Sequence, residues 1–306
     1  MAQIDRFQLD KYYNQVKDQE ALLNFRLNVL NKGFVEFLGM NDKEEVIPES
    51  ARISYSAQGQ VRTDQENKNL TDRLIRNHHT SPVEQLNFSF HIKLPIFVMR
   101  QLVRHRTARL NEISGRYSVL PNDFYIPELQ NIQIQSKTDK QGRELDDDSL
   151  TMEQRQKIQD HLRYEAEFLY KRYLEKLEMG ISRELARINL PLSIYTEIHW
   201  NIDLHNLFNF LRLRLDSHAQ WEIREFASAI YAFVKKLAPM ASESFENHIL
   251  ESLSFSKQEL QMLEMLFKEI HGIWSKDVDY YADNFWEGDK KSFERFLIKL
   301  KEGRQV

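Results

Sequence analysis

The chain has 306 residues, of which 42% are apolar and 11% aromatic, so it can build a sizeable core and is not a largely disordered protein. It contains no cysteine, which excludes disulfides, iron–sulfur clusters, thiolate-bound metals and every mechanism with a cysteine nucleophile. The net charge of −4 argues against a global nucleic-acid binder but leaves room for a local basic pocket.

The start of the chain carries charges where a secretory signal would be apolar: Asp5, Arg6, Asp10 and Lys11. No apolar run approaches membrane-spanning length. We therefore expect a soluble protein of the cytoplasm that has no membrane partner.

The first third of the chain combines helices and strands. Residues 7–40 are predicted to be helical, and the alternation over residues 51–55 indicates a short strand. A helix is predicted around residues 70–76. The clearest strand covers residues 87–93, because the apolar side chains at alternate positions from Phe88 share one face.

Pro95 stands where a helix can begin, and residues 96–104 are predicted to form it. Residues 124–127 indicate another strand. The chain turns polar over residues 133–149, with three consecutive aspartates from Asp146, which favours an exposed insertion.

A capping box at Thr151 opens a long helix that Gly180 stops. A short helix over residues 182–188 and a strand over residues 194–202 follow.

Asp203 can cap the next helix, which runs to Leu215. A further helix leads from Ser217 to Pro239, and Ser256 caps a last one that ends at Gly272. These elements predict an α+β fold with a central, mostly antiparallel sheet flanked by helices. Long helices fill the second half, and a helical extension ends the chain.

The densest polar segment lies between Gln101 and Tyr117. Four arginines and one histidine fall within its residues 104–116. Planar guanidinium groups bind phosphate through paired hydrogen bonds, so the segment suits a nucleotide. A solvated basic face, or a network with the chain's many carboxylates, explains the pattern equally well. No glycine-rich Rossmann turn or P-loop is present, so basic side chains would have to hold any phosphates.

Arg104-His105-Arg106, seven intervening residues and then Ser114 resemble the signature of the flavin-dependent thymidylate synthases. The flanking residues 111–118 are similar to that family too. Further similar segments occur in the family's order: 79–84, 95–98, 186–191 and 213–222. The resemblance therefore covers a core of about residues 52–239. Two segments are not part of this similar core: an insertion at about 133–149 and a helical C-terminal extension at about 240–306. We expect the core and both segments to form a single domain that spans residues 1–306.

The resemblance implies a homotetramer with active sites at subunit junctions. Such an enzyme converts dUMP to dTMP with FAD as redox cofactor, methylene-tetrahydrofolate as carbon donor and NADPH as reductant. It needs no nucleic-acid partner. The absent cysteine agrees with this, because a redox cofactor would have to carry the step that other thymidylate synthases begin with a thiol.

Residues that match the family's motif for dUMP are Gln101, Arg104, Glu112, Ser114, Gly115, Arg116, Arg187 and Arg214. The resemblance makes Arg214 the catalytic residue, since a fixed cation beside the pyrimidine favours the N3-deprotonated ring. The plain alternative is a helix arginine paired with Asp216 or Glu222. Ser114 is expected to bind dUMP rather than act as a nucleophile, because no Ser-His-Asp arrangement can be read from the sequence.

Residues that match the family's FAD contacts are Ser81, Arg104, His105, Arg106, Glu112, Asp203, Leu204, His205 and Asn209. Many members have Asn-x-Arg where this chain has Asp203-Leu204-His205, so cofactor affinity could depend on pH near neutrality. Gln85 also stands where members often carry histidine. Asp203 could instead be only a helix cap.

His79 and Tyr117 match positions linked to folate and NADPH access, although a buried structural role for His79 stays open. The remaining histidines show no HExxH or comparable spacing, which predicts no metal.

Two other functions remain. One is a non-catalytic protein that binds nucleotides or single-stranded RNA through the same arginines. The other is a flavoprotein oxidase that only consumes NADPH.

Overall fold

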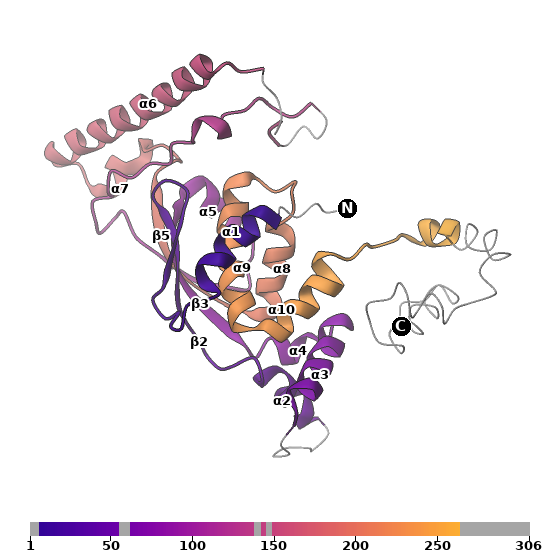
Figure 1. Cartoon of the computed structure of the whole chain (residues 1–306). Helices are drawn as coiled ribbons and strands as arrows, with labels where there is room; N and C mark the ends of the chain where they lie inside the picture. Colours follow the sequence, from indigo (N-terminus) through magenta and orange to yellow (C-terminus); the bar gives the residue numbers. More distant parts are fainter. Residues whose placement is uncertain (1–5, 55–61, 138–141, 145–148, 264–306) are drawn as a thin grey trace. The chain divides into compact units, whose positions relative to one another are not determined.

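The computed structural model of the chain describes residues 6–54, 62–137, 142–144 and 149–263 (Figure 1). The chain forms two compact units, residues 1–252 and residues 253–306. The first contains the sheet and every residue expected to bind a ligand. In the second, Ser256 caps a helical turn: the Glu259 N–H donates to the Ser256 hydroxyl over 3.3 Å. The predicted end of that helix at Gly272 lies outside the described residues.

The strands are β1 (Arg26–Val29), β2 (Gly33–Met40), β3 (Asn87–Pro95), β4 (Arg109–Glu112) and β5 (Tyr195–Asp203). The α-helices are α1 (Arg6–Val16), α2 (Val46–Ile53), α3 (Asp64–Arg76), α4 (Thr80–Val83), α5 (Ile96–Leu102), α6 (Met152–Glu178), α7 (Arg183–Ala186), α8 (Leu204–Arg214), α9 (Trp221–Leu237) and α10 (Pro239–Phe245). Two 3-10 turns, η1 (Leu129–Asn131) and η2 (Arg187–Asn189), and the π-helical η3 (Glu246–Leu250) complete them.

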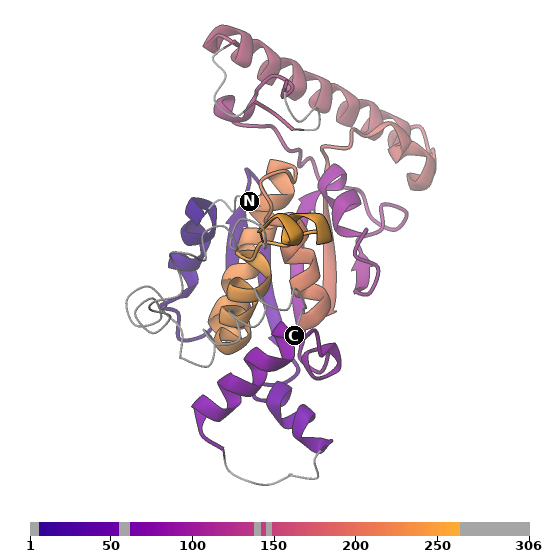
Figure 2. The same cartoon turned by 90° about the vertical axis from the view of Figure 1, so that its right-hand side faces the viewer.

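The five strands form one antiparallel sheet in the order β1-β2-β3-β5-β4. Helices α8, α9 and α10 cover one face of it (Figure 2). The alternating residues Phe88, Phe90 and Ile92 of β3 are buried on that face, as is Trp200 of β5. A strand with one buried face requires this period of two. The predicted α+β class with a central antiparallel sheet is confirmed.

Helix α9 forms the centre of the core and is buried from Glu222 to Val234. Phe233 stacks on Phe37 of β2, with ring centroids 5.8 Å apart. Each fully buried side chain of this size contributes about 1.5–3 kcal/mol by leaving water. The buried carboxylate of Glu225 accepts a 2.6 Å hydrogen bond from the Tyr12 hydroxyl, so α1 is joined to α9 through a satisfied polar contact.

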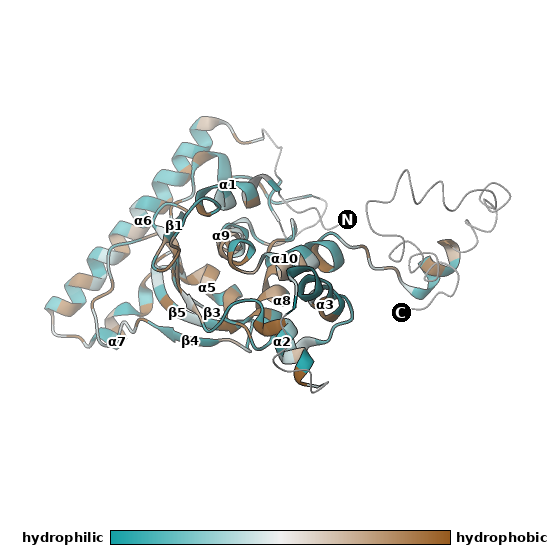
Figure 3. Cartoon of the chain, turned by 60° about the horizontal axis from the view of Figure 1, so that its bottom comes forward, coloured by the Kyte–Doolittle hydropathy of each residue, from teal (hydrophilic) through white to brown (hydrophobic). Residues whose placement is uncertain are grey.

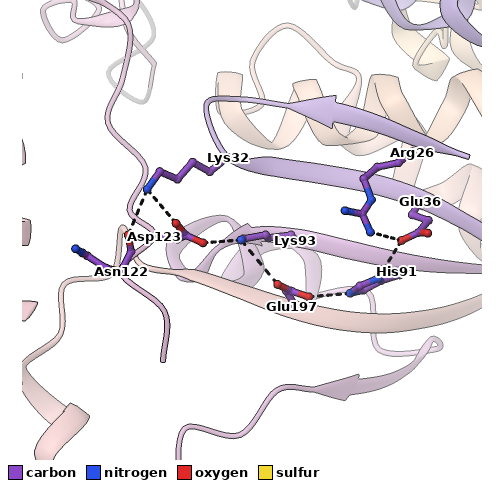
Figure 4. Close-up of polar contacts among 8 residues, drawn as sticks. All are labelled: Arg26, Lys32, Glu36, His91, Lys93, Asn122, Asp123 and Glu197. Carbon is purple, nitrogen blue, oxygen red and sulfur yellow. Dashed lines mark hydrogen bonds and ion pairs between the residues drawn. The ribbon is translucent and has the colours of Figure 1, made fainter. Parts of the chain in front are cut away.

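The opposite face of the sheet carries charged side chains, which Figure 4 shows in a row across β1, β2, β3 and β5. His91 lies between two carboxylates, 3.1 Å from Glu36 and 3.0 Å from Glu197. Partial burial raises the pKa of Glu36, but hydrogen bonds from Arg26 and His91 outweigh this and hold the pKa below its usual range. The row runs through Arg26, Glu36, His91, Glu197, Lys93, Asp123 and Lys32.

Helix α6 lies apart from the helices that cover the sheet, as Figures 1 and 2 show. The predicted capping box at Thr151 begins it, and Gly180 follows its end with a φ of 86°, which favours glycine. Figure 3 shows apolar and polar residues mixed along this helix. Large apolar side chains such as Tyr164 and Phe168 are exposed on it, and so is Leu185 on α7.

Two predictions for the first third were wrong. Residues 7–40 are helical only in α1, whereas residues 26–40 form the hairpin of β1 and β2. Leu30 at its turn has a φ of 58°, which a continuous helix does not allow. Residues 51–53 of the strand predicted at 51–55 are instead the end of α2, whose buried face carries Ile47 and Ala51 one turn apart, and residue 55 lies outside the described residues.

The remaining differences are smaller. Residues 124–127 make only an isolated bridge between Phe124 and Ile194. The helix predicted over 182–188 divides into α7 and η2. The insertion at 133–149 is not uniformly exposed, since Arg143 forms an ion pair with Glu222 on α9; its residues 138–141 and 145–148 lie outside the description. Throughout the described part, every helix is too short or too polar to cross a bilayer.

Candidate functional site

The arginine-rich segment follows the end of α5 and leads into β4 at the edge of the sheet. Helix α5 closes with hydrogen bonds from the N–H groups of Val103 to Met99 and of His105 to Leu102. Strand β4 pairs only with β5 and is exposed at all four positions. Figure 3 shows this edge strand as largely hydrophilic. Arg104 and Arg106 are exposed in the connecting turn, where their guanidinium groups are accessible to a ligand.

Arg214 at the end of α8 is held against this turn. Its Nε donates to Nε2 of His105 over 3.2 Å, and its Nη2 donates to the carbonyl oxygen of Gln101 over 3.5 Å. Burial lowers the pKa of His105 to about 4, and the positive charge of Arg214 acts in the same direction. The imidazole is therefore neutral near pH 7 and can accept from Arg214.

Burial also lowers the pKa of Arg214, although a guanidinium keeps its charge at neutral pH. Its hydrogen-bond partners are His105 of the turn and Gln101 of α5, and the alternative ion pair with Asp216 or Glu222 is not formed. Asp216 instead contacts His218, and Glu222 contacts Tyr125. A half-buried cation with fixed orientation is what electrostatic catalysis requires.

A second group lies where the segment leaves β4. A Cβ atom at Gly115 would lie 3.0 Å from Cδ and 3.2 Å from Nη1 of Arg187, so glycine lets this arginine pack against the backbone. The Arg116 N–H donates to the Ser114 hydroxyl over 3.3 Å, and the Arg116 guanidinium pairs with Glu184 at 3.2 Å. The structure thus brings Ser114, Gly115, Arg116 and Arg187 together.

Three further expected residues belong to the same segment of the chain: Gln101, Glu112 and Tyr117. Glu112 on β4 accepts a 2.6 Å hydrogen bond from the Thr196 hydroxyl, which orients its carboxylate at the sheet edge. The Gln101 side chain donates to Gln220. Tyr117 is 75% exposed, so its ring is available to a ligand or a partner.

A cavity of about 300 Å³ lies between the α3–α4 turn and α8. It contains three of the expected residues, His79, His205 and Asn209. Sequence reasoning missed His78, Thr80 and Arg212; the seven-residue spacing from His205 to Arg212, two turns of one helix, was the available signal. The complete lining is Leu74, Ile75, His78, His79, Thr80, Val83, His205, Phe208, Asn209, Arg212 and Ile249.

Three other expected residues lie around this cavity without lining it. Ser81 is exposed on α4, beside the lining residue Thr80. Asp203 is the N-cap of α8 and accepts from the Asn206 N–H over 2.9 Å, so its capping role is confirmed. The Leu204 side chain is fully buried in the core, and its N–H donates to the Leu86 carbonyl oxygen. The structure therefore does not bring the Leu204 side chain to the cavity.

Ser114 lacks the partner that a nucleophile needs, and the described part of the chain holds no candidate metal centre. The hydrogen bond that Ser114 accepts comes from a backbone N–H group and supplies no base. No group of three or more histidines, aspartates and glutamates is placed to bind a metal ion there.

The chain is thus an α+β protein with an arginine-rich sheet edge and a cavity lined by histidines and an arginine. The chain belongs to the family described as thymidylate synthase complementing protein, whose sequence model matches residues 37–240. That match begins earlier than the resemblance we drew from about residue 52.

Similar curated proteins carry the name flavin-dependent thymidylate synthase. The protein of Treponema denticola is 46% identical over 278 residues, covering 91% of this chain and 98% of its own length. That of Thermus thermophilus is 46% identical over 241 residues, covering 78% and 84%. Among solved structures, the UMP/dUMP methylase PolB from Streptomyces cacaoi bound with 5-Br dUMP is similar with a TM-score of 0.64 and 27% identity. That match covers 73% of this chain and 99% of PolB.

Proposed function

We infer that this chain is a flavin-dependent thymidylate synthase, a methyltransferase that converts dUMP to dTMP. It uses methylene-tetrahydrofolate as carbon donor, FAD as redox cofactor and NADPH as reductant. Relatives with that name match almost the whole chain, and the similar PolB structure holds a dUMP analogue. The structural observation that carries the proposal is the Arg214 guanidinium, fixed by a neutral His105 beside the arginine-rich turn.

The cavity suits FAD by the chemistry of its lining. Leu74, Ile75 and Phe208 offer apolar surface for an aromatic ring, while the imidazoles and Arg212 offer donors for phosphate. His79, His205 and Asn209 would hold the cofactor there, with Ser81 and Asp203 beside it. When bound, the flavin supplies the electron transfer for which this chain has no side chain of its own.

The two arginine groups suit dUMP. Arg116 and Arg187 would bind phosphate, with Ser114 and Gly115 donating beside them. Arg214 would stand by the pyrimidine and favour the N3-deprotonated ring, because a fixed cation lowers the cost of that charge.

Gln101, Arg104 and Glu112 complete the dUMP set. Arg104 and Glu112 would contact both dUMP and FAD. His105 and Arg106 would contact FAD alone. Since His105 contacts Arg214, we also propose that it positions this guanidinium. His79 and Tyr117 would face the folate and the nicotinamide.

We propose that the enzyme acts as a homotetramer in the cytoplasm, with substrate sites shared between subunits. The support is the open edge beside Arg187: the neighbouring side chains of Leu185, Ile188 and Leu192 are 57%, 69% and 62% exposed. Large apolar side chains around a charged group are typical of a surface that a partner covers. The reaction requires no metal and no nucleic acid.

The direct test is the colour and activity of the purified protein. It should be yellow, bleach with NADPH and form dTMP from dUMP and methylene-tetrahydrofolate. A colourless protein that cannot be reconstituted with FAD and forms no dTMP would overturn the proposal. NADPH consumption that neither dUMP nor folate alters would favour an oxidase, and salt-sensitive RNA binding without dTMP would favour the RNA-binding alternative.

A further inference from the structure

The end of α10 and the π-helical η3 lie beyond residue 240, where the match to the family's sequence model ends. They nevertheless pack against α3, and Figure 3 shows α10 beside that helix. Ile249 of η3 is one of the residues that line the cavity between the α3–α4 turn and α8. No motif of the family resemblance falls in this segment, so its contacts with the cavity walls are what indicate a role.

One set of contacts holds this segment to α3. Asp72 of α3 accepts hydrogen bonds from the Ser244 hydroxyl over 3.2 Å and from Nε2 of His248 over 2.7 Å. Arg76, one turn further along α3, pairs with the other oxygen of the same carboxylate at 3.3 Å. Partial burial raises the pKa of Asp72, but these three partners outweigh this and hold the pKa below its usual range. The carboxylate is therefore charged near pH 7 and accepts only, so Nε2 of His248 carries the hydrogen.

A second contact holds the segment to α8. The ring of Phe245 stacks on that of Phe208, with centroids 4.3 Å apart and planes 4° apart. Phe208 lines the cavity, whereas Phe245 is fully buried behind it. Because stacked rings attract each other beyond the area that they bury, the position of Phe245 fixes that of Phe208. Residues 244–249 therefore connect the two walls of the cavity, and Ile249, the last of them, lines the space that these walls enclose.

Resting on the proposed function, we propose that residues 244–249 form a clamp that keeps FAD in the cavity, with Asp72 and His248 as the positioning residues that keep the clamp closed. The clamp fixes the separation of α3 and α8, so the walls fit the cofactor before it binds. Opening of the contact between Asp72 and His248 releases η3, removes Ile249 from the lining and lets FAD leave. Both side chains are partly exposed, so the loss of their contact leaves the hydrophobic core intact.

The first test measures the dissociation rate of FAD from the full-length protein, followed by the fluorescence of the released flavin. His248→Ala removes the donor and should release FAD at least about tenfold faster, the usual size of one hydrogen bond to a charged group. His248→Gln keeps an N–H group for the carboxylate, so its rate should stay within about twofold of the wild-type rate. The control is His161→Ala, an exposed histidine on α6 outside the lining, which should release FAD as the wild type does.

A double variant tests whether the two residues act through one contact. Asp72→Ala should release FAD at least as fast as His248→Ala does, and combining the two substitutions should bring no further increase. Two residues that stabilise the protein independently would instead multiply their effects. Bound FAD should also slow amide hydrogen exchange in residues 244–250 and leave that of α6 unchanged, which a contact with no role at the cavity would not do.

Three results would overturn the inference: wild-type release rates in His248→Ala and Asp72→Ala, multiplied rates in the double variant, or exchange in residues 244–250 that FAD does not change. If the wild type binds FAD and forms dTMP in any of these cases, the proposed function stands and only the clamp is rejected. If the wild type binds no FAD and forms no dTMP, both fail.

Discussion

The histidine-lined cavity and the arginine-rich edge differ in how much of each site one chain encloses. Elements α3, α4 and α8 and residue Ile249 of one unit wall the cavity. At the edge, Arg104, Arg106 and Arg116 are exposed, and apolar side chains beside them are uncovered. A binding site whose walls all come from one chain forms when that chain folds. A site at an open edge is complete only after the subunits have assembled. Cofactor and substrate binding should therefore respond differently to the same change.

The two sites also differ in how they use histidine. Burial and the neighbouring Arg214 hold the pKa of His105 at about 4, so acidification to pH 5.5 leaves this ring mostly neutral. His78, His79 and His205 instead line the cavity between the α3–α4 turn and α8, where a ligand can reach them. Moderate acid should thus preserve the contact between Arg214 and His105.

The largest effect should come from Arg214→Ala. We expect dTMP formation to fall at least about 100-fold, because removing one preorganised electrostatic contact costs that much. FAD should be retained, since Arg214 does not line the cavity. Turnover and flavin content of the purified variant check this. Arg6→Ala, an exposed arginine paired with Glu251, is the control, and wild-type turnover in Arg214→Ala would reject the catalytic role.

The next effect concerns assembly. Ile188→Asp places a charge on the exposed apolar surface beside Arg187, so the tetramer should dissociate and dUMP affinity should fall about tenfold. FAD binding should stay within about twofold, because residues of one chain line the cavity proposed for it. Light scattering and calorimetry measure both. Leu23→Asp, at an exposed leucine outside this surface, should remain tetrameric; an intact Ile188→Asp tetramer would place the interface elsewhere.

A smaller effect should follow from Gly115→Ala. The new methyl group would meet the Arg187 side chain at 3.0 Å and displace it, so the KM for dUMP should rise about tenfold. FAD affinity should be unchanged. Steady-state kinetics at saturating FAD test this, with Ser118→Ala in the same exposed loop as control. An unaltered KM for dUMP would show that Arg187 does not contribute to the substrate site.

The smallest effect is a pH dependence of stability. The folded-state pKa of His105 is lowered from 6.5 to about 4, so between these values the unfolded chain binds a proton that the folded chain refuses. The contribution of His105 to stability should therefore fall as the pH drops through this window and stay constant above it. His105→Asn should reduce the loss between pH 7 and pH 4.5 by about 1–2 kcal/mol.

Thermal unfolding at both pH values and one protein concentration measures this difference. His161→Asn, an exposed histidine on α6, should behave as the wild type does. An equal loss in His105→Asn and wild type would show that the ring is not shielded from protonation.

The elements predicted correctly have strong local signals. The alternation in β3, the capping box at Thr151 and the cap at Asp203 each act within a few residues. The hairpin of β1 and β2 was missed because Leu22, Phe25 and Leu30 also suit a helical period. Its strands become favourable only when β2 pairs with β3, about 50 residues away, as in the pair Glu36↔His91.

The candidate site shows the same limit. The arginine motif and its glycine could be read from the sequence, but the partner of Arg214 is His105, 109 residues away. Arg212 and His78 carry no motif and become notable only once folding places them around one cavity. The chemical character of individual residues can be predicted from the sequence, whereas contacts between distant residues depend on the tertiary fold.

The charged row across the outer face of the sheet has a consequence for how the strands align. Glu36 lies directly opposite His91, and Lys93 opposite Glu197, while Phe37 and Phe90 are opposite on the other face. Moving one strand by a single residue would turn its charges into the core and its aromatic rings into water. A shifted register is thus disfavoured on both faces of the sheet. Charged side chains would be buried in the core, and ion pairs would be lost on the outer face.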